Sequence, residues 1–252
     1  ANTLAQNGGA ILALAGSSVT LTNTVLHANK ATAVGGAIFS QGALFIQSSL
    51  FYRNSAGTDG GAVGFTRVLS VHASQFLSNT AANGGGIVQK TLDAGSALTI
   101  TGSLFRSNVA SSFSGGALFV LAPYFISSST FEANLAGFGG GGIEARFPAT
   151  GTVEFSTFVR NAASTFSGGA IESAAPLTIS FSTFLTNTAR FSGGAVKHTS
   201  FFGAPVTVIA SLFRGNQATG ANCLPACNDG AGGAIHSIFT PIIVDASTFD
   251  NN

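Results

Sequence analysis

The chain has 252 residues, only 8% of them charged, and a formal net charge of +1. A typical domain carries about 25% charged residues, and no Lys/Arg cluster is present, which argues against nucleic acid or an anionic membrane as the main partner. No apolar stretch approaches the roughly 20 residues of a membrane-spanning helix, so we expect no transmembrane segment.

Two tetrapeptides alternate along the sequence, each nine times. Gly-Gly-x-(Ile/Val/Leu) begins at Gly8, Gly35, Gly60, Gly84, Gly115, Gly140, Gly168, Gly193 and Gly232. Phe-x-x-Asn begins at Phe51, Phe76, Phe105, Phe131, Phe158, Phe184, Phe213 and Phe249, after a first copy that begins at Leu26. The copies close on Asn29, Asn54, Asn79, Asn108, Asn134, Asn161, Asn187, Asn216 and Asn252. Such a fixed period is typical of a solenoid.

A strand is expected between the two motifs. Five residues before each Phe, or before Leu26, the sequence has Leu21, Ile46, Val71, Ile100, Ile126, Val153, Ile179, Val208 and Val244. Seven residues before, it has Val19, Leu44, Leu69, Leu98, Tyr124, Gly151, Leu177, Val206 and Ile242. The two columns share one face of a strand of period two.

A corner is expected before each Phe. Two residues before it stand Thr24, Ser49, Ser74, Ser103, Ser129, Ser156, Ser182, Ser211 and Ser247. The parity of the inward positions changes between the aliphatic column and this one, which indicates a turn between two strands.

A right-handed parallel β-helix of about nine coils, each of roughly 25 to 30 residues, satisfies all these columns as a single domain over residues 1–252. Equivalent residues then stack about 4.8 Å apart, so the Phe column forms an aromatic ladder. The Asn column forms a hydrogen-bonded ladder at a turn, where Asn tolerates the left-handed conformation. The Gly-Gly pair suits a tight corner with positive φ.

The pairing of Gly-Gly-Ala-Ile, as at Gly35–Ile38, with Phe-x-x-Asn resembles the repeats of the chlamydial polymorphic outer-membrane proteins. The resemblance covers the chain from Gly8 to Asn252. It implies a right-handed β-helical surface protein, in some cases an adhesin, and it brings no catalytic residues. The membrane barrel of such proteins is missing from this sequence.

Cys223 and Cys227 lie in one Gly/Asn-rich stretch and are expected to form a local disulfide. A disulfide favours an oxidising, extracellular compartment. A metal site is the alternative, although only Asp229 and the more distant His236 are near enough to add ligands. We expect no cofactor.

Right-handed β-helices also include carbohydrate-active enzymes, which need clustered carboxylates. Glu144, Glu172, Lys197 and His236 occupy the same position on successive coils, just after the Gly-Gly motif. A separation of about 5 Å between the two glutamates is compatible with a retaining carboxylate pair. We favour a solvated charge ladder in which Lys197 neutralises Glu172. Further inter-coil pairs are expected between Arg106 and Glu132 and between Arg214 and Asp250.

Four consecutive coils place a phenylalanine two residues before Gly-Gly: Phe113, Phe138, Phe166 and Phe191. The rings either extend the core or form a partly exposed seam for a partner or a neighbouring rod. The sequence alone does not decide between these two alternatives.

The leading hypothesis is a non-enzymatic extracellular protein, structural or adhesive, whose partners are other copies of itself or a cell-surface or glycan ligand. A polysaccharide lyase or glycoside hydrolase is the alternative. An ice-binding protein is a weaker one. The threonine columns around Thr20-Leu21-Thr22 and Thr99-Ile100-Thr101 are interrupted by Phe45, Phe125, Glu154, Ile243 and Asp245. The sequence begins without Met and carries no obvious end caps, so we expect either flanking sequence or continuation into a filament.

Overall fold

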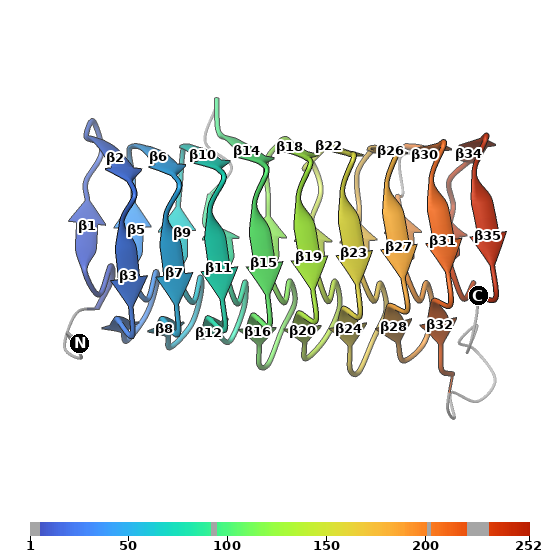
Figure 1. Ribbon diagram of the computed structural model, residues 1–252, viewed down its shortest axis with the longest axis horizontal. Coiled ribbons are helices and arrows are strands. Elements are labelled where there is room, and N and C mark those ends of the chain that lie inside the picture. Colours follow the sequence, from blue (N-terminus) through green and yellow to red (C-terminus); the bar gives the residue numbers. More distant parts are fainter. Residues whose placement is uncertain (1–5, 92–94, 201–202, 221–231) are drawn as a thin grey trace.

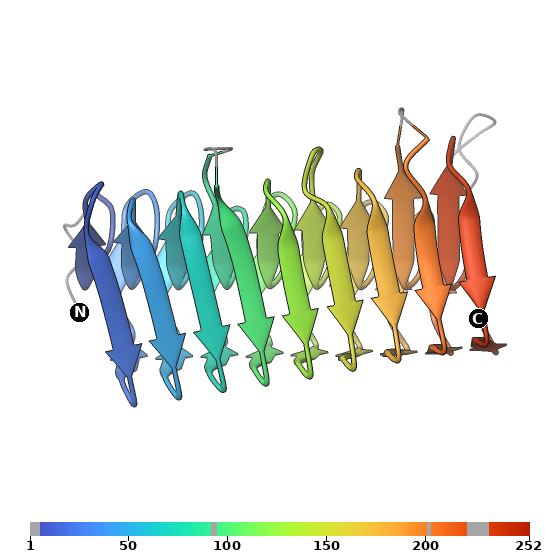
Figure 2. The same ribbon diagram turned by 90° about the horizontal axis from the view of Figure 1, so that it is seen from above.

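Four sheets, each running the length of a rod, form the fold of the computed structural model (Figure 1). The structure describes residues 6–91, 95–200, 203–220 and 232–252. All strand pairs are parallel and join each coil to the next, so the colours follow the rod axis from blue to red in both views (Figures 1 and 2). The structure confirms the predicted right-handed parallel β-helix.

The strands of each sheet follow one another along the rod in chain order. Sheet I contains β1 (Ile11–Ala13), β5 (Ile38–Ser40), β9 (Val63–Phe65), β13 (Ile87–Gln89), β17 (Leu118–Val120), β21 (Ile143–Ala145), β25 (Ile171–Ser173), β29 (Val196–Thr199) and β33 (Ile235–Ile238). Sheet II contains β2 (Ser18–Thr22), β6 (Ala43–Gln47), β10 (Val68–His72), β14 (Ala97–Thr101), β18 (Tyr124–Ser127), β22 (Gly151–Glu154), β26 (Leu177–Ser180), β30 (Val206–Ile209) and β34 (Ile242–Asp245). Sheet III contains β3 (Val25–His27), β7 (Leu50–Tyr52), β11 (Gln75–Leu77), β15 (Leu104–Arg106), β19 (Thr130–Glu132), β23 (Thr157–Val159), β27 (Thr183–Leu185), β31 (Leu212–Arg214) and β35 (Thr248–Asp250). Sheet IV contains β4 (Lys30–Ala31), β8 (Ser55–Ala56), β12 (Thr80–Ala81), β16 (Val109–Ala110), β20 (Leu135–Ala136), β24 (Ala162–Ala163), β28 (Thr188–Ala189) and β32 (Gln217–Ala218).

The phenylalanines of sheet III form one continuous stack inside the rod. Neighbouring rings from Phe51 to Phe249 have centroids 4.6–4.9 Å apart and planes within 5° of parallel. The rings from Phe51 to Phe213 are fully buried. The aliphatic columns of sheet II face the same interior, so these residues form one hydrophobic core.

The asparagines after sheet III form the predicted ladder. Asn134, for example, donates from its backbone N and its Nδ2 to Oδ1 of Asn161 at 3.1 and 2.9 Å. Its Nδ2 also donates to the carbonyl oxygen of Phe105 at 2.9 Å. Each central asparagine therefore connects three coils.

These asparagines do not themselves use the left-handed conformation that Asn tolerates. Positive φ occurs instead at the residue before each one: Ala28, Arg53, Ser78, Ser107, Ala133, Arg160, Thr186, Gly215 and Asn251. The asparagine follows the turn, which leaves its amide free to bond along the rod.

The serine column forms a second polar ladder at the predicted corner between sheets II and III. The backbone N of Ser129 donates to Oγ of Ser156 at 3.1 Å, and Oγ of Ser129 donates to the carbonyl oxygen of Ser127 at 2.8 Å. A residue with positive φ precedes each serine, as at Ser128 and Phe155.

The first glycine of every Gly-Gly pair has positive φ, as predicted. At Gly35, where φ is +68°, a Cβ would lie 2.0 Å from the carbonyl oxygen of Ile38. Both the backbone conformation and the lack of space therefore require glycine at this corner.

Candidate functional site

The outward-facing column of sheet I changes from apolar to charged side chains halfway along the rod. Successive strands place Leu12, Phe39, Gly64, Val88, Phe119, Glu144, Glu172, Lys197 and His236 in register. The register confirms that Glu144 and Glu172, and then Lys197 and His236, occupy neighbouring strands. The charged residues thus continue a column that is apolar over the first five strands.

From β5 to β29 this column is largely covered, although it faces out of the rod, whereas Leu12 in the first coil is exposed. The segment between sheets IV and I folds over it, and β5 and β9 are buried on both faces. In the apolar half, Val34 of this segment packs with Phe39 and Val88 in a small second cluster. In the charged half, the equivalent segment between β20 and β21 covers Glu144 and Glu172.

The carboxyl groups of Glu144 and Glu172 converge under Gly139 of the covering segment. A Cβ at Gly139 would lie 1.9 Å from Oε2 of Glu172 and 3.3 Å from Oε2 of Glu144, which places the two oxygens within about 5 Å of each other. Both Oε2 atoms are buried and lack a hydrogen-bond partner. Burial and the repulsion between the two groups favour the protonated form of at least one of them, because like charges this close do not both ionise readily.

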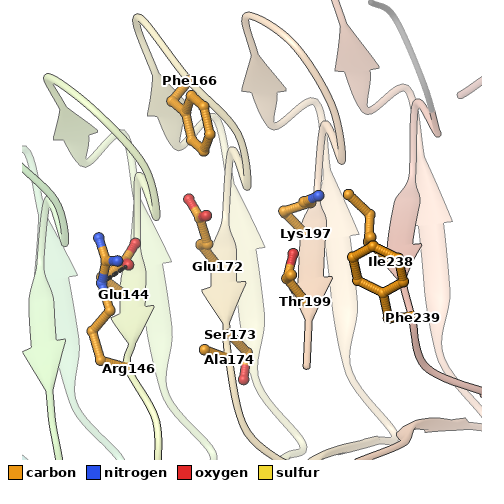
Figure 3. A pocket seen from close by; sticks show the side chains of 10 residues that line it. All are labelled: Glu144, Arg146, Phe166, Glu172, Ser173, Ala174, Lys197, Thr199, Ile238 and Phe239. Carbon is orange, nitrogen blue, oxygen red and sulfur yellow. Dashed lines mark ion pairs between the residues drawn. The ribbon is translucent and has the colours of Figure 1, made fainter. Parts of the chain in front are cut away.

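Arg146 is the cation that pairs with this site. Its Nε lies 2.5 Å from Oε1 of Glu144, while the Arg146 side chain is 49% exposed (Figure 3). Lys197 forms no ion pair within 4.0 Å with any residue of the described ranges. The predicted solvated ladder, neutralised by Lys197, is therefore wrong: Glu144 is 1% exposed and Lys197 is 5% exposed.

Burial raises the pKa values of the two glutamates and lowers that of Lys197, and both shifts favour the uncharged form of the side chain. Burial raises the pKa of Glu144 well above its usual range, and the neighbouring Glu172 raises it further, against the charge of Arg146 and a hydrogen bond from Ser114. Burial raises the pKa of Glu172 to about 7, against Arg146 and Lys197. Burial lowers the pKa of Lys197, and Glu172 opposes that shift.

Two cavities lie beside the pair and share Arg146. Cavity A, of about 420 Å³, is lined by Glu144, Arg146, Glu172, Lys197, Phe166 and Phe239 among others (Figure 3). Cavity B, of about 480 Å³, is lined by Phe113, Ser114, Phe119, Phe138 and Arg146 with two further polar residues. Arg146 thus lines both cavity A and cavity B, which lie one after the other along sheet I.

The four phenylalanines before Gly-Gly form a ridge on the covering segments, which we call the Phe ridge: Phe113, Phe138, Phe166 and Phe191. Phe113 is 61% exposed and Phe138 is 39% exposed. Phe138 stacks on Phe166 at 4.4 Å between centroids, and Phe166 meets Phe191 edge to face at 6.0 Å. None of the four belongs to the buried clusters of the described residues, so the ridge lies at the surface beside the cavities.

Two surface ion pairs were predicted from the register, with different outcomes. Arg214 pairs with Asp250 at 2.8 Å, as expected. Glu132 pairs with Arg160 rather than with Arg106, although Arg106 is its strand neighbour. The prediction for Arg106 and Glu132 is therefore wrong, because Arg160 reaches Glu132 from the following turn.

Two features of the site escaped the sequence interpretation. Arg146 stands two residues after Glu144, where the next two strands have Ala174 and Thr199, so no column marks it. Gly139 occupies a position held by Ser114 and Ser167 in the flanking coils. This glycine, in the coil that carries Glu144, was the feature of the sequence that could have indicated a buried acidic pair.

A second exposed aromatic pair lies at another corner of the rod. Phe155 and Phe181 are 57% and 55% exposed, and their rings stack at 5.0 Å. Both have positive φ at the turn before the serine column. On sheet II, Phe45 is 43% exposed and is the strand partner of Thr20, so it interrupts a threonine column weighed for ice binding.

The predicted disulfide between Cys223 and Cys227 lies outside the described residues. Within the described ranges, no group of three or more His, Cys, Asp or Glu side chains is placed to hold a metal ion. Nor does any helix long and apolar enough to cross a membrane occur in that part of the chain. No family model, curated protein or solved structure matches the chain.

Proposed function

We propose that the chain is a non-enzymatic extracellular scaffold that binds a cell-surface or glycan ligand along the Phe ridge and the neighbouring cavities. The observation that carries the proposal is the Phe ridge beside two cavities, with Phe113 and Phe138 exposed and Phe166 and Phe191 half-buried. Contiguous exposed aromatic surface is typical of an interaction site. The Phe, Ser, Asn and aliphatic ladders meanwhile point inward or along the rod and serve its stability.

The repeat resemblance to bacterial surface proteins and the expected Cys223–Cys227 disulfide support an extracellular location. A second copy of the chain is the other partner class for the same ridge. Sedimentation of the purified chain at several concentrations tests for self-association, because self-association depends on protein concentration whereas binding of a glycan requires the added ligand.

A glycan array probed with the labelled chain tests the proposal, with mass spectrometry of the bound sugars to detect cleavage. We expect binding without cleavage. Replacing all four ridge phenylalanines by Thr should abolish binding and leave the β-sheet circular dichroism and the unfolding transition in place. Phe113→Thr alone, at the most exposed ring, serves as the variant that keeps the fold. Unchanged binding by both variants would contradict the proposal.

A carbohydrate-active enzyme is the second candidate, favoured by the buried pair Glu144 and Glu172. A retaining glycosidase needs two carboxyl groups about 5–5.5 Å apart, one ionised and one protonated, and the raised pKa values of this pair favour that state. However, both Oε2 atoms are buried under Gly139, so a glycosidic bond does not fit between them without displacing this segment. Cleavage of array sugars by the native chain, lost in Glu144→Gln and in Glu172→Gln, would reverse our preference.

A further inference from the structure

Cavities A and B form a site that extends along the rod. Their lining includes Phe119 on β17 and Ile238 on β33, five neighbouring strands of sheet I. Four strand spacings of about 4.8 Å amount to roughly 19 Å. A ligand that fills both cavities must therefore be elongated and must pass the Arg146 side chain.

Two cationic side chains and two carboxyl groups line this path. Arg146 and Lys197 both line cavity A, and Arg146 also lines cavity B. The glutamates opposite them are held together in a buried space where burial raises the pKa of both, so that at least one of them is favoured in its neutral form and the two cations are not fully neutralised. Nε of Arg146 is engaged with Glu144, and half of the side chain is exposed, so its terminal nitrogens are available to an anion.

The lining combines aromatic rings with small hydroxyl side chains. Phe113 and Phe138 border cavity B together with Ser112 and Ser114, and Phe166 and Phe239 border cavity A together with Thr199. A sugar ring presents apolar C–H faces and a rim of hydroxyl groups, which matches such a surface. A peptide strand finds no free strand edge at these cavities, since β21, β25 and β29 are paired on both sides, so strand addition is excluded at this place.

We propose that cavities A and B bind an acidic oligosaccharide along the rod, with a carboxylate of the sugar paired to Arg146. This inference rests on the proposed ligand-binding role of the scaffold and names the chemical class of the ligand. The sugar carboxylate accepts hydrogen bonds from the terminal nitrogens of Arg146, and the amine of Lys197 contributes a second positive charge about two strands farther along the rod.

Isothermal titration with tetragalacturonate, a hyaluronan tetrasaccharide and sialyllactose tests the inference on the full chain. The methyl ester of tetragalacturonate is the matched ligand, because it keeps the rings and removes the charge. Arg146→Gln is the site variant, and Arg106→Gln, at an exposed arginine of sheet III, is the matched control. We expect at least one acidic probe to bind, and its affinity to fall about tenfold or more in Arg146→Gln, as for loss of a charge-assisted contact.

The inference also requires that Arg106→Gln binds as the native chain does and that the methyl ester binds weakly. Failure of all three acidic probes to bind at about 1 mM, where even weak sites register, overturns it. Equal binding of acid and ester, or an equal effect of both arginine variants, overturns it as well. In those cases binding of neutral glycans on the array would leave the scaffold proposal standing, whereas loss of the array signal too would remove both.

Discussion

The ring of Tyr124 occupies the space beside Gly151 in the next coil. A Cβ on Gly151 would lie 2.2 Å from Cζ and 2.3 Å from Oη of Tyr124. The two residues are strand partners in sheet II, in a column that otherwise carries aliphatic side chains. The large Tyr124 ring thus fills the space of its own side chain and the space that a side chain at Gly151 would occupy.

This relationship predicts a strong coupling between the two positions. Gly151→Leu alone should destabilise the chain by about 1–3 kcal/mol through overpacking, and Tyr124→Leu alone should leave a cavity. The double variant restores a continuous leucine column from Leu98 to Leu177, so its cost should fall below the sum by about 1–3 kcal/mol. Urea unfolding of the four proteins measures the coupling, and additive costs would contradict it.

The hydroxyl of Tyr124 gives a separate prediction. Its Oη atom is buried without a hydrogen-bond partner, and burial raises the pKa of this phenol far above its usual value. Tyr124→Phe removes an unsatisfied polar group and should stabilise the fold by about 1 kcal/mol. A lower urea midpoint for Tyr124→Phe would show that the hydroxyl has a partner in solution.

The asparagine ladder should be most sensitive to substitution in its middle. Asn161→Ala removes the acceptor for both nitrogens of Asn134 and the donors to Phe131 and Asn187. Since the groups are buried, the cost should reach about 3 kcal/mol or more. Asn29→Ala, at a partly exposed end of the ladder, removes one side-chain bond to Asn54 and should cost about 1 kcal/mol. Equal costs at both positions would contradict the ladder account.

The nine-fold repeat made most of the fold predictable, because each column reports the same environment nine times. Register, inward faces and the Phe, Ser and Asn ladders followed from it. The turn conformation did not: the left-handed position before each asparagine holds residues as different as Ala133, Arg160 and Thr186, so no residue type marks it. A repeat shows which positions are alike, and leaves their backbone angles undetermined.

The candidate site was predictable only in part. The sequence placed Glu144 next to Glu172, since both follow a Gly-Gly motif. Their burial was missed because the cover comes from segments between sheets IV and I, whose composition varies from coil to coil. Phenylalanines in those segments were visible in the sequence, but their exposure depended on how each segment folds over sheet I.

The acidic pair predicts an unusual pH dependence of stability. The pKa of Glu172 is about 7 in the folded chain, against 4.5 for an ordinary glutamate, and the pKa of Glu144 is raised too. At these two glutamates the folded state therefore holds more protons than the unfolded state between about pH 4.5 and 7, so their contribution to stability falls as the pH rises through this window, while the lowered pKa values of His198 and His236 act in the opposite sense. Arg146, Lys197 and Ser114 face the pair and limit the shift.

Glu172→Gln should flatten this dependence. At pH 8 the variant should be more stable than the native chain by an amount on the order of 3 kcal/mol, the equivalent of the raised pKa of Glu172, and near pH 4 the two should converge. Asp245→Asn, at an exposed position on sheet II, controls for the loss of one negative charge. Thermal unfolding between pH 4 and 8 provides the measurement; a difference between native chain and variant that does not grow with rising pH would contradict the raised pKa of Glu172.

The Phe ridge and the internal Phe ladder should respond in opposite ways to truncation. Phe113 is 61% exposed, so Phe113→Ser should change the free energy of unfolding by no more than about 0.5 kcal/mol. Phe131 is fully buried between Phe105 and Phe158, so Phe131→Ala should cost about 3–5 kcal/mol. Phe131→Leu should cost less, because Leu26 fills the same column in the first coil. If Phe113→Ser proved as costly as Phe131→Ala, the ridge would belong to the core, and its rings would not be available to the ligand that we propose.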